Sequence, residues 1–177
     1  MNTFVVPHDP NWKSAFELEA RALFSVASAC RLTLHHIGST SIPGILAKPI
    51  IDLLGVVADL DQLDVCSLAI ESLGYEAMGE LGIEGRRYFR KVDSNGTRTH
   101  HLHVFEMGSP HIERHLAFRD YLRHHPDIAT KYSDLKTSLT REKPATWDGY
   151  VDGKASFVEA IEKDAVVWFR QMRVQIV

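Results

Sequence analysis

The sequence predicts an α/β (α+β) fold in which a mixed sheet is followed by a layer of helices, and three observations lead to this class. Two apolar runs, at 32–37 and 50–57, have the length and the Ile, Leu and Val content of strands. The segments 86–92 and 97–106 flank Asp-Ser-Asn-Gly, a turn sequence typical of a β-hairpin. After residue 108 the apolar spacing is helical only, so the chain is predicted to end in a helical layer.

The remaining elements follow from local start and stop signals. Asp9-Pro10 is a good helix start, because a capping carboxylate precedes a proline at the first helical position. Gly74 ends a second helix, and Ser109-Pro110 opens a third. The predicted elements outside the strands above are helices at 10–27, 60–73, 110–125, 127–142 and 154–173, a short strand at 75–78 and a loop at 144–149. We predict one domain over 1–177, with an αβ core at 1–108 and a helical layer at 109–177.

Composition limits the class of protein. The 177 residues are 45% hydrophobic and 24% charged, which is ordinary for one globular domain. A net charge of −3 argues against general nucleic-acid binding. No apolar run approaches the ~20 residues of a membrane span, and no signal peptide is recognised, so we expect a cytoplasmic protein without membrane contact. Cys30 and Cys66 match no metal or redox spacing and are expected to fill small apolar sites. The oligomeric state is not determined.

A small-residue turn at Gly38-Ser39 follows the first strand, and Asp52 lies within the second apolar run. Glycine permits a tight bend, and the serine hydroxyl and amide are suitable donors to a phosphate oxygen. A carboxylate among apolar neighbours is costly to bury without a cation or a hydrogen-bond donor. Asp52 is therefore a candidate metal ligand or general base facing the turn, and an ion pair with a nearby Arg or Lys is the alternative.

Two longer motifs make a family resemblance specific. The residues Gly-Ser-Thr-Ser-Ile-Pro-Gly at 38–44, with Lys-Pro-Ile-Ile-Asp at 48–52, resemble the signature of the GrpB family. The segment 110–123 is also similar to that family, and the similarity extends over nearly the whole chain. The resemblance implies a nucleotidyltransferase-like mixed sheet with a helical tail. It also implies binding of a nucleotide or another phosphorylated small molecule, with a divalent metal.

The chain departs from the superfamily pattern at one position. That pattern places two carboxylates one residue apart on a strand, so that both point to one face and bind two metals. Asp52 matches the second carboxylate, but Ile50 stands where the first would be. Glu106, near the end of a later strand, is our candidate for the third carboxylate of the pattern. The predicted two-metal site is therefore incomplete.

Two histidines extend the candidate site. His101 and His103 flank Leu102 in a predicted strand, so their side chains share one face. If this strand lies beside the strand of Asp52, the three residues form a catalytic and metal-ligating cluster. Two imidazoles and one carboxylate suit Zn, Mn, Fe or Ni better than Mg. For the site as a whole we expect a divalent metal, Mg or Mn, with Zn as the alternative. A general-base or phosphate-donor role, or a polar sheet face without a ligand, remains open.

Basic residues are the candidate phosphate ligands. Lys48 precedes Asp52 by four positions, and Arg86 lies on the first hairpin strand. His115 and Arg119 follow helical spacing on one polar stripe of a later helix, and arginine suits bidentate contact with phosphate. Tyr132 and Lys136, one helical turn apart, are expected to extend that polar stripe, and Lys154 to reach the same cleft from the last helix. The alternative for these three residues is ordinary surface.

These residues favour an enzyme that acts on a nucleotide or another phosphorylated small molecule, with Gly38, Ser39 and Lys48 holding phosphate. The alternative is a non-catalytic module that binds a nucleotide or coenzyme after losing the two-metal site, which Ile50 favours. A third hypothesis is a transition-metal enzyme centred on Asp52, His101 and His103.

Overall fold

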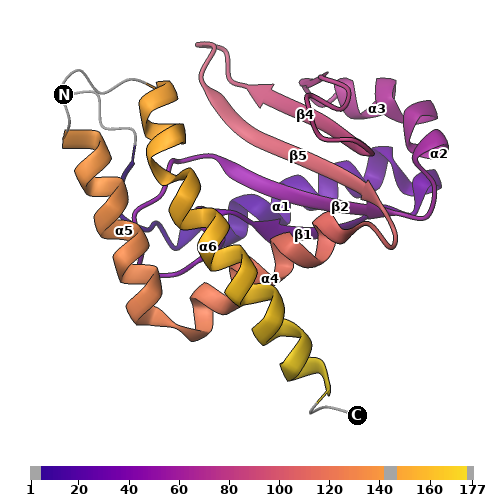
Figure 1. Cartoon of the computed structure of the whole chain (residues 1–177). Coiled ribbons are helices and arrows are strands. Elements are labelled where there is room, and N and C mark those ends of the chain that lie inside the picture. Colours follow the sequence, from indigo (N-terminus) through magenta and orange to yellow (C-terminus); the bar gives the residue numbers. More distant parts are fainter. Residues whose placement is uncertain (1–4, 142–146, 175–177) are drawn as a thin grey trace.

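The computed structural model describes residues 5–141 and 147–174, and its centre is a five-stranded mixed sheet (Figure 1). The strand order is β1-β2-β5-β4-β3, with β2 and β5 parallel and the other pairs antiparallel. The strands are β1 (Thr33–Ile37), β2 (Ile51–Val57), β3 (Tyr75–Ala77), β4 (Arg86–Val92) and β5 (Arg98–Glu106). The predicted mixed sheet and each predicted strand are confirmed.

The helices are predicted well in position and less well in their ends. They are α1 (Asn11–Val26), α2 (Leu60–Val65), α3 (Ser67–Glu71), α4 (Pro110–His124), α5 (Pro126–Arg141) and α6 (Trp147–Val174), with 3₁₀ turns η1 (Ser28–Cys30) and η2 (Ser39–Ser41). The predicted helix at 60–73 is two helices that meet at Cys66. The final helix begins at Trp147 rather than at 154, so the predicted loop is wrong at 147–149, and its remainder, 144–146, lies outside the described residues.

The sheet separates two layers of helices. One face contributes Leu53, Leu102 and Val104 to the main core, which packs against α1 and the α2–α3 region. The other face contributes Leu54 and Phe105 and packs against α4. A third cluster lies among α4, α5, α6 and the loop after η2. Because alternate residues of a strand point to opposite faces, Asp52 shares its face with Leu54 and therefore points toward the side of α4 to α6.

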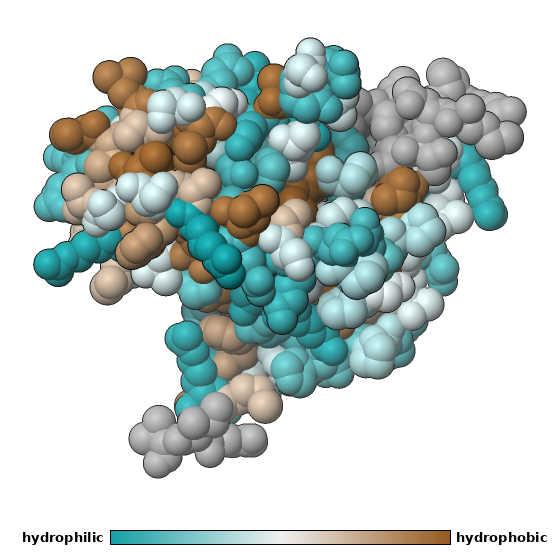
Figure 2. Space-filling view, turned by 180° about the vertical axis from the view of Figure 1, so that it is seen from behind, coloured by the Kyte–Doolittle hydropathy of each residue, from teal (hydrophilic) through white to brown (hydrophobic). Residues whose placement is uncertain are grey.

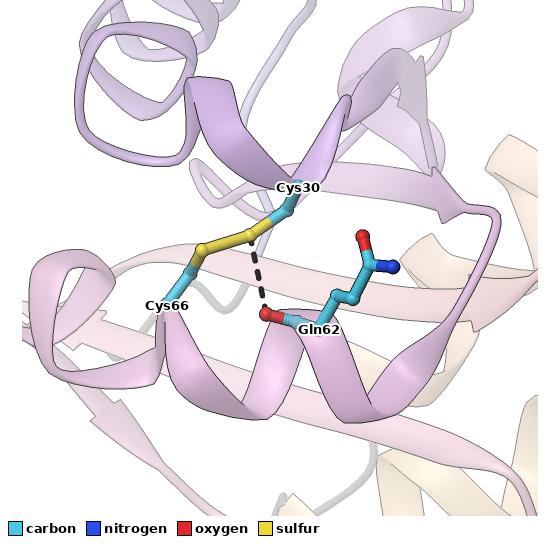
Figure 3. The surroundings of a disulfide bond; sticks show 3 residues. All are labelled: Cys30, Gln62 and Cys66. Atoms are coloured by element: carbon cyan, nitrogen blue, oxygen red, sulfur yellow. Dashed lines mark hydrogen bonds between the residues drawn. A yellow bond between two sulfur atoms is a disulfide. The ribbon is translucent and has the colours of Figure 1, made fainter.

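The two cysteines are joined, which corrects the prediction that they only fill apolar sites. Cys30 in η1 and Cys66 between α2 and α3 form a disulfide with a sequence separation of 36 (Figure 3). Cys30 is buried at the edge of the main core, as expected. Its sulfur lies 3.4 Å from the carbonyl oxygen of Gln62, a contact that becomes a hydrogen bond only in the reduced thiol, since a disulfide sulfur carries no hydrogen.

Exposed apolar side chains gather where α1 to α3 form one end of the molecule, on the left of the view from behind (Figure 2). Leu18, Phe24, Val65 and Leu68 are the large exposed side chains of these helices. No helix within the described ranges combines the length and the apolar character needed to cross a membrane.

Candidate functional site

The turn after β1 lies directly over Asp52. Gly38 has a φ of +70°, in the region that favours glycine, and η2 begins at the next residue. A Cβ added to Gly38 would overlap Oδ2 of Asp52, so this position requires glycine for a second reason. Ser41 Oγ donates a 2.6 Å hydrogen bond to the carbonyl of Gly38, which holds the bend in place.

Asp52 is paired with His101. The two residues are direct partners in the parallel register of β2 and β5, and His101 Nδ1 lies 3.1 Å from Asp52 Oδ1. An ionised carboxylate only accepts hydrogen bonds, so Nδ1 donates and the neutral ring keeps its lone pair on Nε2. That Nε2 is buried and has no hydrogen-bond partner among the described residues. The pair therefore holds a basic nitrogen, already oriented by a carboxylate, inside the site.

His103 is held in the opposite tautomer by Arg86. Arg86 Nη1 lies 3.4 Å from His103 Nδ1, and a guanidinium can only donate, so Nδ1 accepts. Burial lowers the pKa of His103 to about 4, and the ring is neutral near pH 7 with its proton on Nε2. Arg86 itself is fixed by bonds to the carbonyls of Glu80 (3.1 Å) and Leu81 (2.8 Å). His103 is thus a hydrogen-bond donor on the same strand, β5, as His101, whose Nε2 is a potential base.

A buried lysine supports the serine of the turn. Lys136 Nζ, from α5, donates to Ser39 Oγ at 2.7 Å and to the carbonyl of Leu46 at 2.8 Å. The same ammonium lies 3.8 Å from the ring centroid of Tyr132, one helical turn earlier. Burial lowers the pKa of Lys136 to about 7, and the charge of Lys154 lowers it further in the same direction.

A cavity of about 180 Å³ joins these elements. Lys48 reaches it from the loop before β2, and Lys154 reaches it from α6. Burial lowers the pKa of Lys48 to about 8, with contributions from Arg98 and Lys154, and burial also lowers the pKa of Lys154. The lining residues are Ser39, Lys48, Ile50, Asp52, His101, Tyr150 and Lys154.

The charges around this cavity favour an anion. Lys48 and Lys154 line it, and Lys136 lies behind Ser39, so three ammonium groups face one carboxylate, that of Asp52. Each lysine pKa is lowered chiefly because its charged form is poorly solvated there. An entering phosphate oxygen would supply the solvation that burial removes, and ammonium–phosphate hydrogen bonds are about twice as strong as neutral ones.

The donor set also fits one cation. One ligand atom from each of Asp52, His101 and His103 lies within 4.8 Å of the others. The lone pair on Nε2 of His101 is buried without a hydrogen-bond partner among the described residues, and a metal ion could accept it. His103 can join as a ligand only by giving up the hydrogen bond from Arg86 to Nδ1, or by losing the Nε2 proton. Because Nδ1 and Nε2 point to opposite sides of the imidazole, an ion on Nε2 would be held by His101, with Asp52 orienting the ring from Nδ1.

Within the described ranges, the structure brings together no second carboxylate with Asp52 for a two-metal site. Ile50 is buried and apolar where the pattern has its first carboxylate. The choice of Glu106 as third carboxylate is wrong, because it pairs in register with Val57, at the far end of β2 from Asp52, and accepts from the amide of Leu60. His101 holds the register position opposite Asp52 instead.

The predicted site residues divide into three groups. Gly38, Ser39, Lys48, Asp52 and His101 meet at the cavity. A second group forms a neighbouring layer: Arg86, His103 and His115. The ring centroids of His103 and His115 are 5.7 Å apart.

Arg119 is directed elsewhere. It donates to the carbonyl of His36 and pairs with Asp120 at the edge of the sheet, away from Asp52. Tyr150 lines the cavity but was not recognised from the sequence, because it follows a stretch without helical spacing that reads as a loop.

Comparison with known proteins gives consistent matches. The family described as GrpB protein matches residues 2–164. The protein named UPF0157 protein YqkA, from Bacillus subtilis, is 42% identical over 164 residues, which are 93% of this chain and 47% of that protein. The chain thus spans about half the length of this relative.

Solved structures agree with the fold. A crystal structure described as conserved protein GrpB from Enterococcus faecalis superposes with a TM-score of 0.87 at 42% identity, covering 93% of this chain and 98% of that one. A structure of the Cid1 poly(U) polymerase with bound MgGTP superposes with a TM-score of 0.55 at 12% identity, covering 80% of this chain and 46% of that one. The second likeness concerns the fold alone.

Proposed function

Because the chain belongs to the GrpB family, we propose that it binds a nucleotide or another phosphorylated small molecule between Ser39 and Asp52, and transfers a nucleotidyl group with one divalent cation. The family match confirms the resemblance carried by the two motifs. The observation that carries the proposal is the placement of Ser39 and three lysines around the cavity that also contains Asp52.

Phosphate binding follows from the donors in the cavity. Lys136 donates to Ser39 Oγ, and the Tyr132 hydroxyl also hydrogen-bonds to Ser39, so this residue is held in place at the wall of the cavity that a phosphate group would enter. Lys48 and Lys154 approach the cavity from different elements, and the three charges offset those of a phosphate chain. The Nε2–H of His103 is a further donor on the same face.

His101 would hold the cation through Nε2, and Asp52 would orient that ring through its hydrogen bond from Nδ1. When bound, the ion would neutralise charge on the transferring phosphoryl group. Within the chain, Asp52 fixes the tautomer of His101, and Arg86 fixes that of His103, so both rings are oriented before a ligand arrives. Such preorganisation reduces the reorganisation required during a reaction.

The second candidate function is a module that binds the same ligand without turnover. The buried side chain of Ile50 favours it, because this residue, directly before β2, stands where the pattern has the carboxylate that completes a two-metal centre. Both candidates use the same binding site and differ only in the chemistry.

Calorimetric titration of the four ribonucleoside triphosphates, with and without Mn²⁺ or Mg²⁺, tests binding, and a pyrophosphate assay on the same samples tests transfer. We expect Lys136→Met to weaken binding at least about tenfold. Lys131→Met, which removes an exposed lysine from the same helix, is the matched control. Pyrophosphate release that is lost in Asp52→Asn supports the transferase.

Each other outcome is also decisive. If a nucleotide binds but no pyrophosphate is released, even in samples that contain compounds with a hydroxyl group as acceptors, the non-catalytic module is supported. Absence of binding for every nucleotide and for inorganic pyrophosphate overturns both candidates, as does binding that Lys136→Met leaves unchanged.

A further inference from the structure

A second cavity lies on the other side of η2 from Asp52. It has a volume of about 490 Å³ and is bounded by α1, β1, η2 and α4, at the exposed edge of the sheet. We call it the lateral pocket, and it shares no lining residue with the cavity around Asp52. Its volume falls within the range of small-molecule binding sites. The residues that matter for its chemistry are Lys13, Phe16, His36, Arg119 and Arg123.

Two guanidinium groups in the lateral pocket share one carboxylate. Arg119 donates through Nε and Nη2 to Asp120, at 2.7 and 2.9 Å, and through Nη1 to the carbonyl of His36. Arg123 donates through Nε and Nη2 to the carbonyl of Ser41. Its Nη1 lies 3.7 Å from Asp120, beyond hydrogen-bond distance. Arg123 therefore has donors directed at no strong acceptor, although its position is fixed by the backbone.

The balance of charge also favours an anion. Lys13, Arg119 and Arg123 line the pocket, whereas Glu17 lines it and Asp120 borders it. Burial lowers the pKa of Arg123, and the nearby charge of Arg119 acts in the same direction. A bound anion would relieve the repulsion between these two guanidinium groups.

The opposite wall is flat and largely apolar. The rings of Phe16 and His36 stack with a centroid separation of 4.8 Å and an interplanar angle of 4°. His36 Nε2 donates to Thr40 Oγ1, since that hydroxyl gives its own hydrogen to the carbonyl of Ile50. Leu34 and Pro43 add further apolar surface. Such a wall suits a flat unsaturated ring.

We propose that the lateral pocket is a second binding site, for a small molecule that carries a phosphate or carboxylate on a flat ring. Arg123 and Lys13 hold the anionic group, and the ring lies against the apolar wall beside Phe16. The occupant would be linked to the Gly38-Ser39 turn through two hydrogen bonds. Arg123 donates to the carbonyl of Ser41, and Ser41 Oγ donates to the carbonyl of Gly38. This proposal does not depend on the proposed function.

Calorimetric titration with phenyl phosphate and with benzoate tests the site, and phenol serves as the uncharged probe. We expect at least one of the two anions to bind, and Arg123→Gln and Lys13→Gln each to weaken it about tenfold. Phenol should bind more weakly by a similar factor. Lys154→Met, which alters the cavity around Asp52 from α6, should leave the affinity unchanged. If only one of the two anions binds, its charged group, phosphate or carboxylate, is the group that the pocket recognises.

Because Arg123 also supports Ser41, its variant is checked by thermal unfolding, and Lys13→Gln, which changes an exposed residue, keeps the test valid if Arg123→Gln is unstable. The proposal is overturned if neither anion binds at concentrations up to about 10 mM. It is equally overturned if Lys13→Gln has no effect on a bound anion, or if Lys154→Met abolishes its binding.

Discussion

The backbone of Gly38 packs against the carboxylate of Asp52 so closely that no side chain fits between them. The Gly38-Ser39 turn and the acidic group are therefore in contact, with Ile37 and Asp52 paired in register across β1 and β2. This contact fixes the distance between the two halves of the proposed chemistry, and it can be tested without knowledge of the substrate.

Gly38→Ala should disrupt the site far more than Gly44→Ala. Both glycines have positive φ values, +70° and +79°, so each variant bears backbone strain of about 1 kcal/mol. Only at Gly38 does the added methyl overlap Asp52, whereas nothing lies within 4 Å at Gly44. We expect a further loss of about 1–3 kcal/mol in the free energy of unfolding, measured in urea. Binding of Mn²⁺ should be lost in the same variant. Equal effects of the two substitutions would contradict the contact.

Anion binding at the Asp52 cavity should weaken as pH rises above neutrality. Burial lowers the pKa of Lys136 to about 7 and that of Lys48 to about 8, so both lose their protons between pH 6 and pH 9. A phosphate monoester is already fully ionised above about pH 7. We expect the affinity for a nucleotide to fall at least about tenfold from pH 7 to pH 9, with proton uptake on binding.

Calorimetry in buffers of different ionisation enthalpy measures that proton uptake directly. Lys136→Met should bind more weakly and show a flatter pH profile, while Lys131→Met should follow the unmodified chain. An affinity that is constant from pH 7 to pH 9 would show that the charges of Lys48 and Lys136 do not contribute to binding of the ligand.

Acidification should destabilise the fold through buried histidines. Burial lowers the pKa of His36 and of His103 to about 4, below the ordinary value near 6.5. Between pH 4 and pH 6.5 the unfolded chain binds more protons than the folded chain, so the free energy of unfolding increases with pH. The stability that these two histidines contribute therefore decreases as pH falls from about 6.5 toward 4. Each group contributes a slope of at most about 1.4 kcal/mol per pH unit.

Urea unfolding at half-unit intervals from pH 4.5 to pH 7 measures this slope. His103→Gln should reduce it, and His124→Gln, which removes an exposed imidazole at the end of α4, is the reference variant. A slope unchanged by His103→Gln would show that His103 does not titrate as its burial predicts.

The disulfide should stabilise the end of the molecule formed by η1, α2 and α3. It closes a loop with a sequence separation of 36, which in the chain-entropy account stabilises the folded state by about 3–4 kcal/mol. We expect reduction, or Cys30→Ala with Cys66→Ala, to lower the urea midpoint while nucleotide binding at Asp52 persists. Thiol titration of the denatured, unreduced protein should find no free cysteine, and two free thiols would contradict the bond.

Much of the site could be predicted because its parts are local. The turn and the strand after it lie within 38–57, and a glycine-serine turn before an apolar run can be recognised from residue types alone. His101 and His103 were placed on one face by the two-residue period of a strand, and the hairpin was identified by its turn sequence. Helical spacing likewise identified Tyr132 and Lys136 as neighbours, although it left the burial of Lys136 undetermined.

What the sequence determined by itself is therefore the set of local elements and the faces on which their polar residues lie, because these depend on backbone geometry over a few residues. The tertiary structure alone decided that β5 aligns parallel to β2 with His101 opposite Asp52, since register depends on core packing between distant segments. It also decided that Lys136 reaches Ser39 while Arg119 turns to the lateral pocket. The rotation of each helix about its axis is set by the apolar surface it buries, and that surface belongs to other parts of the chain.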